Sequence, residues 1–270
     1  MLGNKKIIGI YVFLIIASFI FLLPFAWITL TSFKTRVETF AFTLLFTPTL
    51  RNYINVLSSP FINYAVNSLV ISTSSVLIAL ILGMPAAYLL SRYKFKYRET
   101  LYFFILTIRM GPAAAFAVPF YLLYSQFNML DTHIGVILIY QTFNLPFVIW
   151  MLKSFIDEVP VELDEAAKVD GCSVFRILWN ILLPLLKPAI FATSILSFIF
   201  SWNEFFMTMV LTSKNAKTIT VNMPSYIGFT RIRWEEMCAA STLAILPIIV
   251  FAILTRKYLV RGLTLGAVKG

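Results

Sequence analysis

Residues 7–30 read IIGIYVFLIIASFIFLLPFAWITL and contain no charged side chain. A helix that crosses the hydrocarbon core of a bilayer needs about 20 mostly apolar residues, so this run is long enough. Lys5 and Lys6 precede it, as in a secretory signal peptide. The apolar part of a signal peptide is only about 7–15 residues long and ends at a small-residue cleavage site, which does not follow here. We therefore expect residues 7–30 to be a retained membrane span.

The whole chain has the composition of a membrane protein. Of its 270 residues, 60% are hydrophobic and 13% are charged, whereas soluble domains have roughly 45–50% and about 25%. Together the apolar runs predict an all-α integral membrane protein, a single transmembrane domain over residues 1–270 with six spans. The expected spans are residues 7–30, 61–90, 101–125, 134–155, 188–211 and 237–260.

The Lys and Arg residues between the apolar runs indicate how the chain is oriented. If the amino terminus is cytoplasmic, the cytoplasmic segments carry roughly twice as many of these residues as the outer segments, as the positive-inside rule expects. Both termini are therefore predicted on the cytoplasmic side, with residues 156–187 as the longest cytoplasmic loop. The net charge of +10 does not indicate nucleic-acid binding, because the basic residues lie in short segments between spans.

The loop at residues 156–187 has the features of two short helices. Residues 159–171 read VPVELDEAAKVDG, in which Pro160 suits the first helical position and Gly171 suits the left-handed residue after the last turn. Acidic residues near the start of this segment favour the positive end of a helix dipole. A second helical run is expected over residues 173–183, with its first residue as the N-cap, before prolines break the chain.

The first of these helices has a narrow face at spacings of three and four residues, formed by Leu163, Ala166, Ala167 and Asp170. Its two alanines would let the backbone of a partner approach closely, which favours a docking helix on the inner membrane surface. Composition alone leaves a solvated connection between two spans equally open.

A longer spacing pattern resembles the EAA signature of bacterial ABC-importer permeases. Its fixed positions are Glu165-Ala166-Ala167, Gly171, Ile181 and Leu183-Pro184. Other stretches resemble the sugar-importing branch, specifically its maltose-type smaller permease subunit, at residues 48–53, 109–112, 145–150, 202–205 and 261–270. Asp164 departs from the pattern, because the family more often has Glu there, but the charge is kept.

The resemblance implies a type I ABC-importer fold with a cytoplasmic coupling helix, in the cytoplasmic (inner) membrane of a bacterium or archaeon. It implies a pore shared with a second permease subunit, two cytoplasmic ATPase subunits and an extracytoplasmic solute-binding protein that delivers a sugar. An importer for another small polar solute, such as glycerol phosphate, is the alternative. The implied ATPase-coupling residues are Asp164, Glu165, Ala166, Ala167, Asp170, Gly171 and Pro184.

The chain has no Walker A sequence, so ATP and Mg are expected only in the ATPase subunits, with no cofactor and no enzymatic activity in this chain. Motifs of hydrolases and zinc enzymes are also absent, and Cys172 and Cys238 have neither metal-ligand nor disulfide spacing. Two other classes of membrane protein are the alternatives. An intramembrane hydrolase would be active as this chain alone, without partner subunits. A secondary transporter would need no ATPase and would give the alanine-faced helix no purpose.

Two ionisable residues fall within the predicted spans, Arg109 in the third and Glu204 in the fifth. Such residues are costly in a bilayer and are therefore functional candidates. Glu204 follows Trp202 and Asn203, and sugars are recognised by aromatic rings together with donor and acceptor side chains. The candidates for the translocation path are Arg109, Asn144, Trp202, Asn203 and Glu204.

Each candidate also has a structural alternative. Arg109 could snorkel or clamp two helices, Trp202 could pack at a helix interface, and Glu204 could pair internally, with Arg109 as one conceivable partner. Asn144 and the hydroxyl residues of the second span could hold helices together by hydrogen bonds. The sequence leaves these alternatives open.

Overall fold

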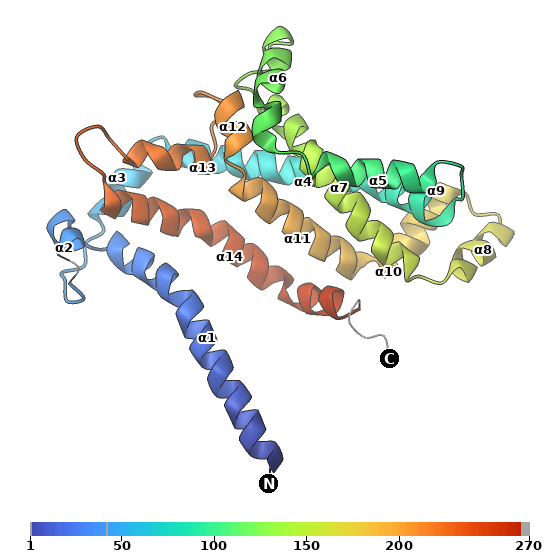
Figure 1. Ribbon diagram of the computed structural model, residues 1–270, viewed down its shortest axis with the longest axis horizontal. Helices are drawn as coiled ribbons and strands as arrows, with labels where there is room; N and C mark the ends of the chain where they lie inside the picture. The colour runs from blue at the N-terminus through green and yellow to red at the C-terminus, as the bar shows by residue number, and fades with distance from the viewer. Residues whose placement is uncertain (1, 42, 266–270) are drawn as a thin grey trace. The chain divides into compact units, whose positions relative to one another are not determined.

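The computed structural model describes residues 2–41 and 43–265, so residues 266–270 of the family-like tail lie outside the described residues. Within the described part the chain consists of helices and loops, with one isolated bridge between Ile227 and Ile232. In chain order (Figure 1) the elements are α1 (Leu2–Ser32), α2 (Arg36–Phe40), α3 (Arg51–Leu57), α4 (Phe61–Arg92), α5 (Arg98–Ile108), α6 (Ala113–Gln126), α7 (His133–Asp157), α8 (Val161–Val169), α9 (Val174–Arg176), the π-helix η1 (Ile177–Leu182), α10 (Leu183–Leu185), α11 (Lys187–Asn203), α12 (Phe206–Leu211), α13 (Ile219–Asn222), the 3₁₀ helix η2 (Met223–Tyr226) and α14 (Trp234–Leu265).

Four helices are each long and apolar enough to cross a membrane, namely α1, α4, α7 and α14. Two bent pairs reach the same length when each pair is counted as one span. These are α5 with α6, bent by 88°, and Val174–Leu185 with α11, bent by 82°. The expected all-α membrane fold is therefore confirmed, with four continuous spans and two bent pairs that bring the number to six.

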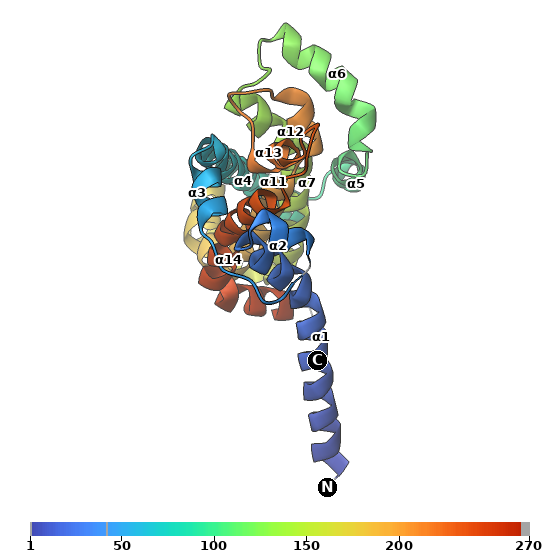
Figure 2. The ribbon, with the colours of Figure 1, turned by 90° about the vertical axis from the view of Figure 1, so that its left-hand side faces the viewer.

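Two of the expected spans are not continuous helices. Residues 109–112 separate α5 from α6, and Figures 1 and 2 show α6 turning away from α5. Pro112 explains this break, because it lacks an N–H group and disfavours the helical conformation at Gly111 before it. Residues 204–205 interrupt the fifth span between α11 and α12, where the sequence has neither proline nor glycine.

The chain forms two compact units. The first holds the described residues up to Asn63 together with Asn222–Leu246, and the second holds Tyr64–Val221 and the described residues from Pro247 onward. Each unit is described by itself below.

In the first unit α1 is apolar and mostly exposed from Lys6 to Leu30, as suits contact with lipid, and is buried at Thr31 and Ser32. At its end Lys34 is buried, with its amino group 4.5 Å from the centre of the Trp27 ring and 5.3 Å from that of Phe46. Asn52 on α3 donates hydrogen bonds of 2.8 and 2.9 Å to the carbonyls of Ser32 and Lys34. These contacts fix the carboxyl end of α1 to α3.

In the second unit α4, α7 and α11 are joined by buried polar side chains. Asn144 on α7 is fully buried and donates to the hydroxyl of Ser75 on α4 at 2.8 Å and to that of Ser201 on α11 at 2.7 Å. Gln141, one turn before Asn144, donates to the same Ser75 hydroxyl at 2.9 Å. Such hydrogen bonds hold membrane helices together where lipid offers no polar partner.

The turn between α6 and α7 is tied by Asp131 to the loop that follows α12. Its carboxylate accepts hydrogen bonds of 2.9–3.2 Å from the backbone N–H groups of residues 213–216. Burial raises the pKa of Asp131, but the N–H donors, led by those of Asn215 and Ser213, outweigh it and hold the pKa at about 2, below its ordinary 3.8.

Asp131 therefore gives the stability of this region an acid dependence. Because its folded pKa is depressed, its stabilising contribution is complete above about pH 4 and is lost as the pH falls toward 2. We expect Asp131→Asn to lower the free energy of unfolding by about 1–2 kcal/mol at pH 6. Thermal unfolding of the purified protein at pH 6, 4 and 3 should show this deficit shrinking with acid, whereas a deficit that stays constant would contradict the assignment.

Candidate functional site

The helix expected in the cytoplasmic loop is present as α8. It spans Val161–Val169, one residue later than the sequence suggested, with Pro160 as its N-cap. Glu162 and Asp164 lie in its first turn and Lys168 in its last, so its charges complement the helix dipole.

Gly171 closes the carboxyl end of α8. The N–H of Cys172 bonds to the carbonyl of Ala167 at 2.9 Å, and the N–H of Gly171 bonds to that of Lys168 at 3.0 Å. This pair of bonds is the Schellman motif, which requires a left-handed residue after the C-cap. Gly171 supplies it with φ of +77°, a conformation that glycine adopts without strain.

Asp164 anchors α8 to a membrane-spanning helix. Its Oδ2 accepts a hydrogen bond of 2.8 Å from Nε of Arg92, the last residue of α4, and the two side chains are only 1% and 8% exposed. Arg92 also donates through Nη2 to the carbonyl of Val159, immediately before α8, at 2.7 Å. One guanidinium therefore holds both the approach to α8 and its first turn.

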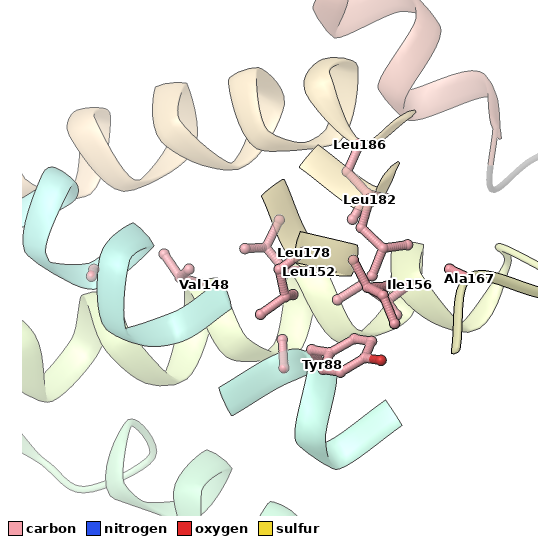
Figure 3. Packing of buried hydrophobic residues seen from close by; sticks show 11 residues of the cluster. Tyr88, Val148, Leu152, Ile156, Ala167, Leu178, Leu182 and Leu186 are labelled. Atoms are coloured by element: carbon pink, nitrogen blue, oxygen red, sulfur yellow. The ribbon is translucent and has the colours of Figure 1, made fainter. Parts of the chain in front are cut away.

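Ala167 faces the same way as Asp164. It is buried in an apolar cluster that includes Tyr88 of α4, Ile156 of α7 and Leu182 of η1, as Figure 3 shows. This cluster and the Arg92 ion pair link the inner side of α8 to the helices that lead into the membrane.

The exposed side of α8 differs from the face expected from the sequence. Since Asp164 and Ala167 turn inward, only Ala166 of the two alanines remains available to a partner. Opposite the anchor lies a set of exposed residues at spacings of three and four, which we call the outward stripe: Glu162, Glu165, Ala166 and Val169. Val169 is apolar yet 88% exposed.

The remaining coupling candidates are also exposed: Asp170 lies beside the outward stripe, and Pro184 lies in α10. Leu163 of the expected face is exposed beside the stripe as well. Ser173 caps α9 as expected, because its hydroxyl accepts the N–H of Arg176 at 3.4 Å. The chain then continues as the π-helix η1, a form that is frequent at functional sites.

Glu204 closes the break in the fifth span. Its carboxylate accepts hydrogen bonds from the N–H groups of Met207 at 2.9 Å and Thr208 at 3.1 Å, and from the Thr208 hydroxyl at 2.7 Å. Glu204 therefore caps α12, and none of the ion pairs found among the described residues joins it to Arg109.

The other path candidates differ in exposure. Arg109 is exposed just after α5, with its guanidinium carbon 4.7 Å from the ring centres of both Phe147 and Phe200. Asn203 is exposed at the end of α11, whereas Trp202 is buried. Asn144 lies in the helix interface described above, so the structure brings only part of the candidate set to an open surface.

Residues 75–265 match the family of binding-protein-dependent transport system inner membrane components. The chain belongs to this family. It is 36% identical to a probable ABC transporter permease protein of Sinorhizobium fredii, over 94% of this chain and 92% of the relative. It is 34% identical to the trehalose/maltose transport system permease protein MalG of Thermococcus litoralis, over 95% of this chain and 94% of the relative.

The fold is similar to that of a bacterial ABC transporter involved in the import of the acidic polysaccharide alginate. The TM-score is 0.76 at 24% identity, over 94% of this chain and 97% of the other. The part that matches the family includes α8, its anchor Arg92 and both interrupted spans. In this inner membrane permease component, α8 and both interrupted spans therefore lie within the region that matches the family.

Two features of this permease component are not evident from the sequence. Arg92 is one of several basic residues after the second span, and nothing in the sequence pairs it with Asp164. Val169 is not recognisable from the sequence as part of the exposed side of α8, because the direction of the helix depends on that pairing. Among the described residues, no group of three His, Cys, Asp or Glu side chains is placed to hold a metal ion.

Proposed function

We propose that this chain is one of two permease subunits of an ATP-driven sugar importer, coupled through α8 to a cytoplasmic ATPase pair. An extracytoplasmic binding protein delivers the solute, and ATP and Mg are held by the ATPase subunits. The observation that carries the proposal is that the two sides of α8 differ. Asp164 and Ala167 anchor its inner side to the rest of the chain, and the residues of its outward stripe are exposed to a partner. A sugar is favoured over glycerol phosphate because the MalG relative is named for trehalose and maltose.

The anchor gives a route from ATP hydrolysis to the membrane. When the ATPase pair closes, it moves the outward stripe, and the Arg92–Asp164 ion pair transmits this movement to α4. The cluster around Ala167 transmits it to α7 and η1. A buried, close-packed contact passes on a displacement instead of absorbing it, so the pore opens outward to receive the solute and later reopens inward.

The path candidates divide into two groups in this proposal. Arg109 and Asn203 are exposed and are assigned to the wall of the path. Asn144, Trp202 and Glu204 are assigned to shaping that wall, since the first two are buried in the helix bundle and the third caps α12.

The proposal is tested by purifying the tagged chain in mild detergent with its partners. We expect a second permease and an ATPase to copurify, and the recovered complex to take up trehalose or maltose in vesicles when binding protein and ATP are supplied. Glu165→Ala should lose the ATPase but keep the second permease, because Glu165 lies on the outward stripe and contributes nothing to the anchor.

Glu99→Ala is a matched control, because Glu99 is an exposed carboxylate whose ion pair, among the described residues, is with its neighbour Arg98 at the start of α5. It should keep both partners. Recovery of this chain alone, stable and active in transport, would refute the proposed assembly.

A further inference from the structure

In the second unit a side chain from one interrupted span contacts the other interrupted span. Arg109 is the first residue of the break between α5 and α6, and its guanidinium lies on Phe200, one turn before the break between α11 and α12. Irregular backbone is tolerated at membrane depth only where it is buried in protein or lines a water-filled cavity. A break that begins at an exposed cation favours the second of these surroundings, a water-filled cavity.

The Arg109 guanidinium is held in position but its donors are open. The rings of Phe147 and Phe200 meet edge to face, with centres 5.2 Å apart and planes at 85°, and each centre lies 4.7 Å from the guanidinium carbon. Among the described hydrogen bonds and ion pairs, none uses this guanidinium. Glu204, the acid considered above as a partner of Arg109, binds the amino end of α12.

An arginine with five unused N–H donors is costly in hydrocarbon. Lipid therefore does not suit this side chain, and water or an oxygen-rich ligand does. The two aromatic faces hold the planar fork by cation–π contact without consuming any donor. A planar guanidinium that is fixed in position can donate two parallel hydrogen bonds to two neighbouring oxygen atoms. Such pairs of oxygens are adjacent hydroxyls of a sugar or the two oxygens of a carboxylate.

We propose that Arg109, clamped by Phe147 and Phe200, is a solute-binding residue of the translocation path that donates hydrogen bonds to paired oxygens of a neutral or acidic sugar. This inference rests on the proposed importer function and names the chemistry of one contact within it. Trp150, 44% exposed and 6.1 Å from Phe147 between ring centres, offers a neighbouring aromatic face for the apolar side of a sugar ring. Cationic solutes are disfavoured at this position.

The first arm of the test measures water access and does not depend on knowing the sugar. In the assembled importer, with Cys172 and Cys238 replaced by alanine, Arg109→Cys is treated with a charged, membrane-impermeant methanethiosulfonate reagent. Phe104→Cys is the matched control, since Phe104 is an exposed apolar residue of α5. We expect Arg109→Cys to react at least about tenfold faster, and equal slow reaction at both positions would overturn the proposal.

The second arm measures uptake of trehalose and maltose by vesicles that contain the importer. Losing one hydrogen bond from a charged side chain to a ligand lowers the affinity about tenfold. Arg109→Gln should therefore raise KM about tenfold. Arg109→Lys should give a KM between those of the wild type and Arg109→Gln. An unchanged KM would overturn the solute contact. If Arg109→Gln instead separates the two permeases on purification, its partner is an oxygen of the second permease, which also overturns it.

The two arms separate this inference from the proposed function. Wild-type vesicles that take up neither sugar would count against the proposed sugar specificity, whereas the reactivity of Arg109→Cys would still show whether this position lines water.

Discussion

Asp164→Asn is expected to uncouple ATP hydrolysis from sugar uptake in the assembled importer. The substitution removes the charge that pairs with Arg92 at 2.8 Å, in a place where both side chains are nearly fully buried. Removing one partner of a buried ion pair leaves the other charge uncompensated, which typically costs about 3–5 kcal/mol. Since Arg92 also holds the carbonyl before α8, we expect α8 to lose its fixed position against α4.

The measurement is the ratio of sugar transported to ATP hydrolysed in vesicles. We expect that ratio to fall by about tenfold or more, because a displacement of α8 then reaches α4 only weakly. A tenfold change corresponds to a free-energy difference of about 1.4 kcal/mol. This difference is smaller than the cost of breaking the buried ion pair. Glu99→Gln serves as the control, because Glu99 is 75% exposed in its pair with Arg98 and exposed pairs contribute about 0–1 kcal/mol.

A charge exchange, Arg92→Asp with Asp164→Arg, separates the loss of the pair from the loss of either residue. Partial recovery of the transport ratio is expected from the exchanged pair. A fully coupled Asp164→Asn variant would show that this ion pair does not transmit the movement.

Gly171→Val is expected to produce the second large effect. Gly171 has φ of +77°, and a Cβ built there would meet no atom within 4 Å. The penalty is therefore backbone strain and not a clash, roughly 1–2 kcal/mol for an ordinary residue and more for a β-branched one. The strain acts on the Schellman bonds that end α8, so we expect the outward stripe to lose its orientation and uptake to fall about tenfold or more.

Gly171→Asn gives the discriminating comparison, because asparagine adopts the left-handed conformation more readily than valine. The expected order of coupled uptake is glycine, then asparagine, then alanine, then valine, measured in the same vesicles. If asparagine and valine were equally harmful, the side chain would be clashing with the ATPase partner and the argument from backbone conformation would be wrong.

Much of this permease could be predicted from the sequence because the deciding signals are local. The apolar runs predict membrane helices from their length, Gly171 predicts the end of α8 from its conformational freedom, and Pro112 predicts a distortion in the third span. Each of these effects acts within a few residues, so it is visible in one stretch of sequence.

The remaining features depend on contacts between distant residues or on which of two local roles a side chain takes. Arg92 and Asp164 are 72 positions apart, and their pairing determines which side of α8 faces a partner. The expected alanine face was wrong for Ala167 for that reason. The break at residues 204–205 has no glycine or proline, and it is stabilised by the Glu204 side chain, whose role as a cap could not be told from a role in an ion pair.

Cross-linking from the two alanines of α8 tests the central claim most directly. Ala166 and Ala167 are adjacent and chemically identical, but Ala166 lies on the outward stripe and Ala167 is 6% exposed in the inner cluster. The experiment uses the assembled importer with Cys172 and Cys238 replaced by alanine and one cysteine placed in the surface of the ATPase subunit that receives α8. A short bismaleimide should cross-link Ala166→Cys to that cysteine. It should not cross-link Ala167→Cys. Equal cross-linking from both positions, or none from Ala166→Cys, would contradict an α8 that is anchored inward and coupled outward.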